Sequence, residues 1–242
     1  MSRAFEVIRD VDLPASPDEV WVAITADPAA WMFPTGMEIP AGATPPEGAP
    51  VTTWEPPQHL AIRMDAPDGT FNALEYLITS RDGGTAHLRY VHSGILADGW
   101  EDQYDAIDGH TDFYLHTLSE YLQHFSGRQA TYVGQPSSGI DGPSTAGGTD
   151  AMDVLRSALG LDSLPSVGTR VSAAIGTGKV EGVVDYSTPE FLGVRTDDTL
   201  YRFFGRNHFG GVVGMSAHVF RDGVDSAPEE RALKDWLDSV YA

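Results

Sequence analysis

Two histidines occupy positions from which a polar side chain could carry chemistry in an otherwise apolar site. His110 follows Ile107 by three residues and precedes Tyr114 by four, so on a helix it would flank an apolar stripe. His92 is in phase with Tyr90 on a predicted strand. An imidazole inside a cavity can orient a ligand or move a proton near neutral pH. A hydrogen-bonded core histidine, or a partly exposed one, would show the same spacing. His110 and His92 are therefore candidates, and no catalytic residue is assigned.

Other patterns that could carry chemistry are weak. Asp108, Asp112 and His116 are spaced by four residues, as metal ligands on a helix could be, but they fall on the polar face, where solvated charge is expected. The sequence GTGK at 176–179 lacks the full phosphate-loop spacing and the hydroxyl residue after lysine. His208 is interpreted as a loop residue, and no serine has the context of a nucleophile elbow. We expect no metal and no cofactor.

One long helix must position His110. Apolar side chains recur at alternating steps of four and three between residues 100 and 125, which is typical of an amphipathic helix. At about 1.5 Å per residue this helix is roughly 39 Å long. The predicted stripe comprises Trp100, Tyr104, Ile107, Thr111, Tyr114, Leu118, Tyr121 or Leu122, and Phe125. The opposite, solvated face comprises Glu101, Asp105, Asp108, Asp112, His116, Ser119 and Gln123.

A helix of this length needs a sheet to lie on, and the preceding residues supply one. Alternating patterns predict strands at 3–13, 51–55, 59–65, 70–80 and 85–93, with a tight turn at 82–84. Short spacing and tight turns favour an antiparallel meander. Ser16, with Glu19 three residues later, predicts a capped helix to about residue 25. Residues 34–50 are rich in Gly and Pro and predict a loop that could cover the mouth of a cavity.

The sheet and the long helix would enclose a cavity between them. Residues in phase on the strands and residues of the helix stripe would face each other across it. The same alternation would arise if these side chains simply filled a core. The predicted ligand-binding residues are Leu60, Ile62, Met64, Leu74, Tyr76, Leu88, Tyr90, Tyr104, Ile107, His110, Thr111 and Tyr114.

The second half of the chain repeats the order of short helix, strands and final helix. A Gly/Pro/Ser-rich linker is predicted at 134–149, which gives a first domain at 1–133 and a second at 150–242. Helices are expected at 150–159 and 227–241, and strands at 169–175, 179–186, 190–196, 199–206 and 212–221. The sequence TTWEPPQHLAIR at 52–63 resembles VVDYSTPEFLGVR at 183–195. We interpret the second domain as a degenerate, truncated α+β copy that lacks the first strand.

Composition excludes several classes of function. The formal charge is −20, which disfavours nucleic acids and anionic membranes as partners. The absence of cysteine removes disulfides and thiolate chemistry. No apolar run reaches the roughly 20 residues of a membrane helix, and no secretory signal is recognisable. A cytoplasmic protein without membrane insertion is expected, and a protein partner cannot be named.

Several stretches resemble a known family. They are Phe5 followed by 17–28 (PDEVWVAITADP), 54–60 (WEPPQHL), 84–94 and the long helix. Residues 3–126 resemble the SRPBCC superfamily of START and birch-pollen-allergen-like domains. The branch that they resemble most is the homologues of the heat-shock ATPase activator. The resemblance implies an α+β helix-grip fold with a hydrophobic cavity between sheet and helix. That branch usually carries Gly-Trp in the final helix, where this chain has Gly109-His110.

The resemblance and the residues together predict binding of a small hydrophobic or aromatic molecule. An enzyme of the cyclase or aromatase kind is an alternative, with His110, His92, Tyr76 and Tyr114 as the available polar groups. A chaperone-regulating interaction protein is a further alternative, which only the resemblance suggests.

Overall fold

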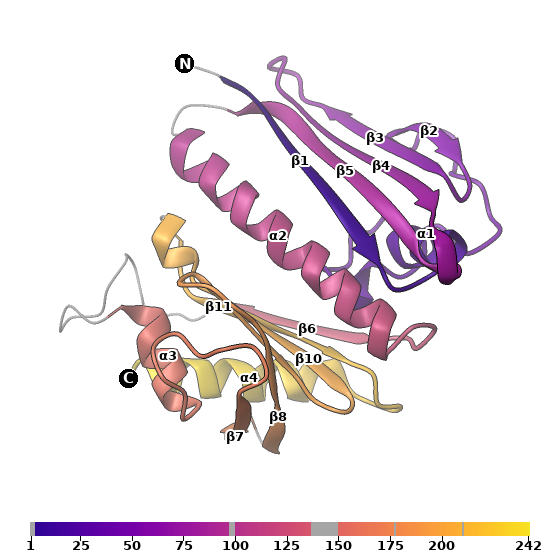
Figure 1. Cartoon of the computed structure of the whole chain (residues 1–242). Coiled ribbons are helices and arrows are strands. Elements are labelled where there is room, and N and C mark those ends of the chain that lie inside the picture. The colour runs from indigo at the N-terminus through magenta and orange to yellow at the C-terminus, as the bar shows by residue number, and fades with distance from the viewer. Residues whose placement is uncertain (1–2, 97–99, 137–149, 177, 210) are drawn as a thin grey trace. The chain divides into compact units, whose positions relative to one another are not determined.

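The computed structural model describes residues 3–96, 100–136, 150–176, 178–209 and 211–242. The chain divides into two compact units, Met1–Arg128 and Gln129–Ala242. Each unit is an antiparallel sheet with helices, so the fold class is α+β (Figure 1). In the described part of the chain, no helix is both long and apolar enough to cross a membrane.

In the first unit, one five-stranded antiparallel sheet carries a long final helix. Its strand order is β1-β5-β4-β3-β2, so the first and last strands pair beside each other. The elements are β1 (Arg3–Leu13), α1 (Pro17–Thr25), η1 (Pro28–Ala30), β2 (Val51–Glu55), β3 (His59–Asp65), β4 (Phe71–Ser80), η2 (Asp82–Gly84), β5 (Ala86–Leu96) and α2 (Trp100–His124). These bounds agree closely with the predicted strands and helices of this half.

Local chemistry fixes the start of α1. The Ser16 side chain accepts from the backbone N–H of Glu19, and the Glu19 carboxylate accepts from the backbone N–H of Ser16 at 2.9 Å. This capping box satisfies two backbone donors that a helix start leaves open. The buried side of α1 includes Trp21, whose ring meets the edge of Trp54 on β2 at 4.8 Å between centroids. The predicted capped helix is confirmed.

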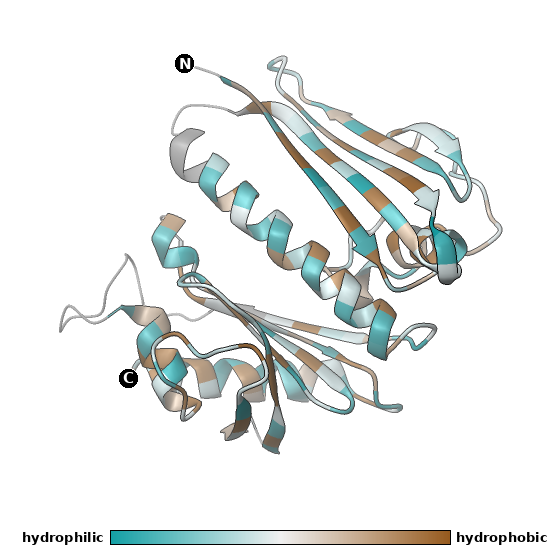
Figure 2. Cartoon of the chain, viewed as in Figure 1, coloured by the Kyte–Doolittle hydropathy of each residue, from teal (hydrophilic) through white to brown (hydrophobic). Residues whose placement is uncertain are grey.

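Helix α2 packs chiefly on β1 and β5, and its apolar stripe is not buried evenly. Hydrophilic and hydrophobic bands alternate along it in Figure 2. Leu118, near the C-terminal end of α2, and Phe125, the residue that follows the helix, are fully buried. Ile107 and Tyr114, farther toward its N-terminal end, are only half-buried. One end of the unit is thus a filled core, while the other keeps open space between helix and sheet.

The prediction that Asp108 and Asp112 are merely solvated is wrong. Arg9 on β1 donates from Nη2 to Asp108 Oδ1 at 2.9 Å and to Asp112 Oδ2 at 3.2 Å. Because β1 is the edge strand beneath the helix, carboxylates one helical turn apart on α2 come within reach of one guanidinium. His116 and Ser119 are half-buried rather than solvated, and Phe113, next to Asp112, is fully buried.

The second unit has the same topology with one additional strand. Its sheet order is β6-β11-β10-β9-β8-β7, so again the first strand pairs with the last. The elements are β6 (Thr131–Pro136), α3 (Ala151–Ala158), β7 (Arg170–Ile175), β8 (Gly178–Ser187), β9 (Phe191–Arg195), β10 (Thr199–Phe204), η3 (Arg206–Phe209), β11 (Gly214–Val219) and α4 (Ser226–Val240). Helix α4 packs on β6 as α2 packs on β1.

Strand β6 corrects three predictions about domain organisation. Residues 134–136 pair with β11 and are not linker; the rest of the predicted linker, 137–149, lies outside the described residues. The boundary between units follows Arg128 rather than residue 133. The second unit has a first strand and is therefore not truncated. The resembling stretches 52–63 and 183–195 fall on equivalent hairpins, β2–β3 and β8–β9, and each has a register shift in its first strand.

Candidate functional site

The first unit contains a cavity of about 560 Å³ between the sheet and the middle of α2. The loop after η1 closes one side of it. None of the described residues that line it is Asp, Glu, Lys or Arg. The lining residues are Trp31, Met32, Phe33, Pro34, Thr35, Met37, Met64, Asn72, Leu74, Tyr76, Tyr90, His92, Ala106, Ile107, His110, Thr111, Tyr114 and Leu115.

A second cavity of about 280 Å³ adjoins the first beneath the loop between η1 and β2. Leu74 and Tyr76 line both, together with Met32, Thr35 and Met37 of the loop. Leu60 and Ile62 on β3 form part of its floor. The two hollows therefore follow one another along the same face of the sheet.

Most of the predicted ligand-binding residues line these hollows. The first is lined by Met64, Leu74, Tyr76, Tyr90, Ile107, His110, Thr111 and Tyr114, and the second adds Leu60 and Ile62. Leu88 and Tyr104 line neither. Leu88 pairs with Ile78, and both are fully buried at the filled end of the sheet, so Leu88 belongs to the core. Ligand binding by the lining residues stays a prediction.

Register explains why the tyrosines meet the cavity. Along paired strands β4 and β5, Ile78 faces Leu88 in the core, Tyr76 faces Tyr90 next, and Leu74 faces His92 farther along. Directly opposed residues in an antiparallel pair project from the same face. The Tyr76 and Tyr90 rings lie 5.1 Å apart between centroids, at the boundary between packed core and open cavity.

Both tyrosines are buried, with 5% of Tyr76 and 9% of Tyr90 exposed. Burial raises the pKa of each phenol well above its ordinary value, and for Tyr90 the neighbouring Tyr76 contributes further. Both therefore carry their protons at neutral pH and can donate. Neither hydroxyl forms a hydrogen bond with the described residues.

His92 lines the cavity as an uncharged imidazole. Its Nε2 lies 2.6 Å from Oδ1 of Asn72 on β4, and its ring meets the edge of Phe5 at 5.1 Å between centroids. Because a carbonyl oxygen can only accept, the proton in this contact belongs to Nε2. Burial lowers the pKa of His92 to about 4, so it is neutral at pH 7.

His110 lines the same cavity from α2. Its Nδ1 lies 2.7 Å from the backbone carbonyl of Ala106, one turn earlier, and so must donate to it. This bond fixes the orientation of the ring and places the second nitrogen, Nε2, at its far side. The ring centroid of Tyr114 is 6.1 Å away. The structure thus brings both candidate histidines to one hollow.

Sequence reasoning missed the contribution of the loop after η1. Phe33 lines the cavity and touches Tyr114 edge-on at 5.9 Å between centroids. Phe33, Met37 and Met64 are among the most exposed large apolar side chains described, and all three line this cavity. The Gly/Pro richness of 34–50 signalled a covering loop but could not show which of its side chains turn inward.

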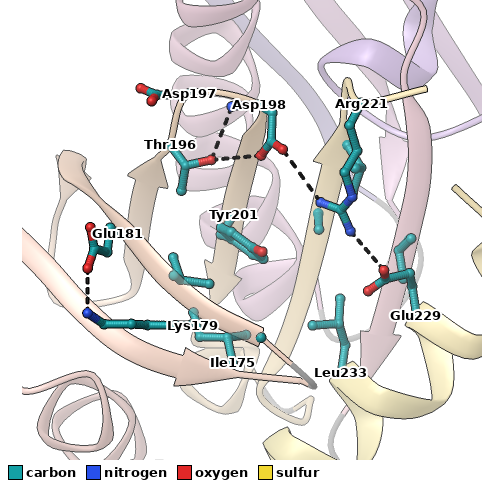
Figure 3. A pocket seen from close by; sticks show the side chains of 15 residues that line it. Ile175, Lys179, Glu181, Thr196, Asp197, Asp198, Tyr201, Arg221, Glu229 and Leu233 are labelled. Atoms are coloured by element: carbon teal, nitrogen blue, oxygen red, sulfur yellow. Dashed lines mark hydrogen bonds and ion pairs between the residues drawn. The ribbon is translucent and has the colours of Figure 1, made fainter. Parts of the chain in front are cut away.

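The second unit has a cavity of about 450 Å³ with a different, charged lining (Figure 3). Arg221 donates to Glu229 on α4 at 2.8 Å and lies 3.9 Å from Asp198. Lys179 pairs with Glu181 across the hollow from them. Each cation that lines this cavity thus already has a carboxylate partner, and the sequence did not predict the site.

The patterns that sequence analysis set aside have ordinary surroundings. His208 lies 2.9 Å from the Asp150 carboxylate, a contact across the start of α3. Residue 177 of the GTGK stretch lies outside the described residues, and its lysine pairs with Glu181. No three His, Asp or Glu side chains in the described ranges are grouped so that they could hold a metal ion.

No family model matches the chain, and no curated protein matches it significantly. Solved structures do show likeness. DynU16, a protein of the dynemicin biosynthetic locus, is 16% identical over 98% of this chain and 95% of its own, with a TM-score of 0.39. The di-domain ARO/CYC StfQ of the steffimycin pathway is 11% identical over 96% and 98%, with a TM-score of 0.32. CalU16 from Micromonospora echinospora is 18% identical over 50% and 75%, with a TM-score of 0.36. Sequence identities and TM-scores this low do not assign the chain to a family.

Proposed function

We propose that the first unit binds a small, uncharged hydrophobic or aromatic molecule in the cavity beside Tyr76 and Tyr90. The observation that carries the proposal is the hollow of about 560 Å³ with no formally charged residue in its described lining. Ligand sites are concave, mostly apolar and roughly 300–1,000 Å³ in volume. The helix across a curved antiparallel sheet also supports the predicted helix-grip description of this unit.

The expected affinity follows from the apolar surface that a ligand would lose to water. A two- or three-ring aromatic that buries roughly 300 Å² at about 25 cal/mol/Å² gains about 7.5 kcal/mol before ordering costs. Because 7.5 kcal/mol alone corresponds to a dissociation constant of roughly 3 µM, these costs move the expected constant to between tens of micromolar and about 1 mM. At a ligand concentration of 100 times that constant, the folded state would gain about 2.7 kcal/mol.

A thermal-shift and native mass-spectrometry screen with uncharged two- to four-ring aromatics and lipids tests the proposal. Leu74→Trp and, from the facing wall, Ile107→Phe should fill the hollow and abolish ligand-induced stabilisation. Leu164→Trp, at a residue 58% exposed in the other unit, is the matched control and should keep it. Absence of any bound ligand by both methods, with the wild-type chain folded, would refute the proposal.

An enzyme of the cyclase or aromatase kind is a second candidate. The observation in its favour is that His92 and His110 line one hollow, with His92 neutral at pH 7 and so able to accept a proton at Nδ1. Incubation with a reactive poly-ketone, followed by mass spectrometry for loss of water, measures it. If His110→Ala and His92→Gln convert the ketone at the wild-type rate, this candidate fails.

The narrower resemblance to homologues of the heat-shock ATPase activator stays a prediction. Nothing in the cavity favours it, because a chaperone partner would bind an outer surface. Affinity capture with the purified chain would test it, and recovery of no chaperone would count against it.

A further inference from the structure

The hydroxyls of two buried tyrosines that line the cavity have no hydrogen-bond partner among the described residues. Tyr76 and Tyr90 oppose each other on β4 and β5, and both line the hollow. Neither hydroxyl oxygen is among the fully buried side-chain atoms that lack a partner, so each keeps accessible surface from which it can donate to a molecule in the hollow. Two such donors on neighbouring strands that line one hollow can together hold one hydrogen-bond acceptor of a molecule bound there.

We propose that Tyr76 and Tyr90 form a two-donor site for an uncharged carbonyl oxygen of the bound ligand. This inference rests on the proposed function and adds the polar feature that the ligand must carry. The high pKa of each phenol keeps its proton in place, so both groups act as donors. A carbonyl oxygen has two lone pairs and can accept from both.

The surroundings favour an uncharged acceptor over a carboxylate. None of the described lining residues is Lys or Arg, and His92 is neutral at pH 7. A carboxylate would lose its water without gaining a Lys or Arg counter-charge, which is unfavourable even with two hydrogen bonds. The carbonyl group of a ketone or quinone loses much less hydration free energy on entering the hollow. Hydrogen bonds from the two phenols replace those that it made with water.

The remaining walls favour a flat molecule. The cavity is bounded by the rings of Trp31, Phe33 and Tyr114 and by aliphatic side chains such as Leu74 and Ile107. A planar ring system packs on such surfaces while its carbonyl reaches the tyrosine end. The substrate class is therefore an uncharged aryl ketone or quinone.

Three probes of equal heavy-atom count separate the possibilities: acetylnaphthalene, isopropylnaphthalene and naphthoate, substituted at the same ring position. Dissociation constants would be measured by calorimetry on the full chain at neutral pH. Tyr76→Phe and Tyr90→Phe should each weaken the ketone about fivefold to tenfold, as the loss of one hydrogen bond predicts. The hydrocarbon should bind both variants as it binds wild type. Naphthoate should bind wild type at least about a hundredfold more weakly than the ketone.

Tyr121→Phe is the matched control. Tyr121 is also buried in the first unit, but its hydroxyl donates to Asp27 at 3.4 Å, and it does not line the hollow. It should leave all three affinities unchanged. Because the Tyr76 and Tyr90 hydroxyls have no described partner, their Phe variants should also unfold at or above the wild-type temperature, which shows that they fold.

The outcomes separate the two proposals. If no probe binds wild type, the proposed function fails and this inference fails with it. If all three bind and both Phe variants bind the ketone as wild type does, ligand binding stands and the two-donor site is overturned. Naphthoate binding as tight as that of the ketone would also overturn it.

Discussion

Arg9 on the first strand donates to Asp108 on the long helix at 2.9 Å, and the same guanidinium also reaches Asp112. This contact joins the two ends of the first unit in sequence, β1 and α2. Because the two carboxylates are four residues apart on one helix, they would repel each other without the arginine. The two carboxylates hold the pKa of Arg9 above its ordinary value, although burial acts in the opposite direction.

Arg9→Met should therefore destabilise the chain by about 1–2 kcal/mol, since it removes three charge-assisted hydrogen bonds and leaves two like charges together. Urea unfolding measures the change. Arg89→Met is the control, because the ion pair of Arg89 with Asp10 lies on the exposed outer face of the sheet, where such a pair is worth about 0–1 kcal/mol. Equal effects of the two substitutions would contradict the proposed role of Arg9 in holding the helix.

His92 should make stability fall as the solution becomes acidic. Its folded pKa, about 4, lies below the ordinary 6.5, so the unfolded chain takes up a proton first as pH falls. The contribution of the neutral ring is complete above pH 6.5 and is lost between about 6.5 and 4. Because the His92 ring is still partly exposed to solvent, we expect the stability lost over this pH range to be about 2 kcal/mol. The other titratable residues lining the hollow are Tyr76, Tyr90, His110 and Tyr114.

His92→Gln should flatten this part of the pH–stability curve, because glutamine can still donate to Asn72 but does not titrate. Denaturant unfolding at several pH values, taken as the difference from wild type, cancels the contributions of shared carboxylates. His87→Gln, at a histidine paired with Asp10 and Asp12 on the outer face, is the comparison. An unchanged slope in His92→Gln would show that burial of this ring does not govern the acid response.

Sequence patterns predicted the elements whose capping motif or apolar periodicity is contained within a short stretch of the chain. The capping box of Ser16 and Glu19, the alternation of β1 and the stripe of α2 are visible within a few residues. Strand β6 was missed because Thr131–Pro136 has little apolar alternation and borders a Gly/Ser/Pro-rich stretch. It becomes a strand by pairing with β11, more than 70 residues later, and no local pattern reports such a partner.

The sequence predicted which strand residues share the face of the sheet that lines the cavity. It did not predict where along that face the cavity begins and ends. Alternation correctly placed Leu74, Tyr76 and Tyr90 on one face of the sheet. It could not show that Leu88, on the same face, belongs to filled core while Tyr90 borders open space. A cavity is a region without side-chain atoms, and its position depends on where the loop and helix pack, which periodicity does not encode. The inward side chains of the loop, such as Phe33, were missed for the same reason.

Replacing the carboxylate of Asp27 by an amide should stabilise the folded state at neutral pH. Burial raises its pKa, although the Tyr121 hydroxyl, which donates to it at 3.4 Å, acts in the opposite direction. A raised folded pKa means that the native state holds the proton more tightly, so this stabilisation is present at low pH and is lost as pH rises. Asp27→Asn should therefore raise the unfolding temperature at neutral pH, with a difference that shrinks in acid.

Asp18→Asn is the opposite-sign control for that substitution. Asp18 is exposed in the first turn of α1, where a negative charge stabilises the helix by about 0.3–1 kcal/mol. The same chemical change should therefore lower the unfolding temperature there. If both substitutions lower the unfolding temperature at neutral pH, burial of the charged Asp27 carboxylate does not destabilise the folded state.

In the second unit, Asp185 and Arg202 form a buried ion pair in which Nη1 of the arginine lies 3.0 Å from both carboxylate oxygens. Asp185 lies at the register shift of β8, where a bulge can redirect a side chain. Arg202→Met should cost about 3–5 kcal/mol, because it removes the cation that compensates the charge of a buried carboxylate. The double variant Asp185→Leu, Arg202→Met should recover most of that loss in denaturant unfolding.

Gly193 on β9 provides the space for this pair. A Cβ at that position would lie 2.1 Å from Asp185 Oδ1 and 2.7 Å from Arg202 Nη1, so Gly193→Ala should destabilise by about 1–3 kcal/mol. Gly178→Ala, in the neighbouring strand β8, is the control, since a Cβ there meets nothing within 4 Å. With Asp185→Ala and Arg202→Ala together, where neither long side chain remains beside position 193, Gly193→Ala should cost less than in wild type. An equal cost in both backgrounds would mean that the glycine is required by the backbone of β9 and not by the ion pair.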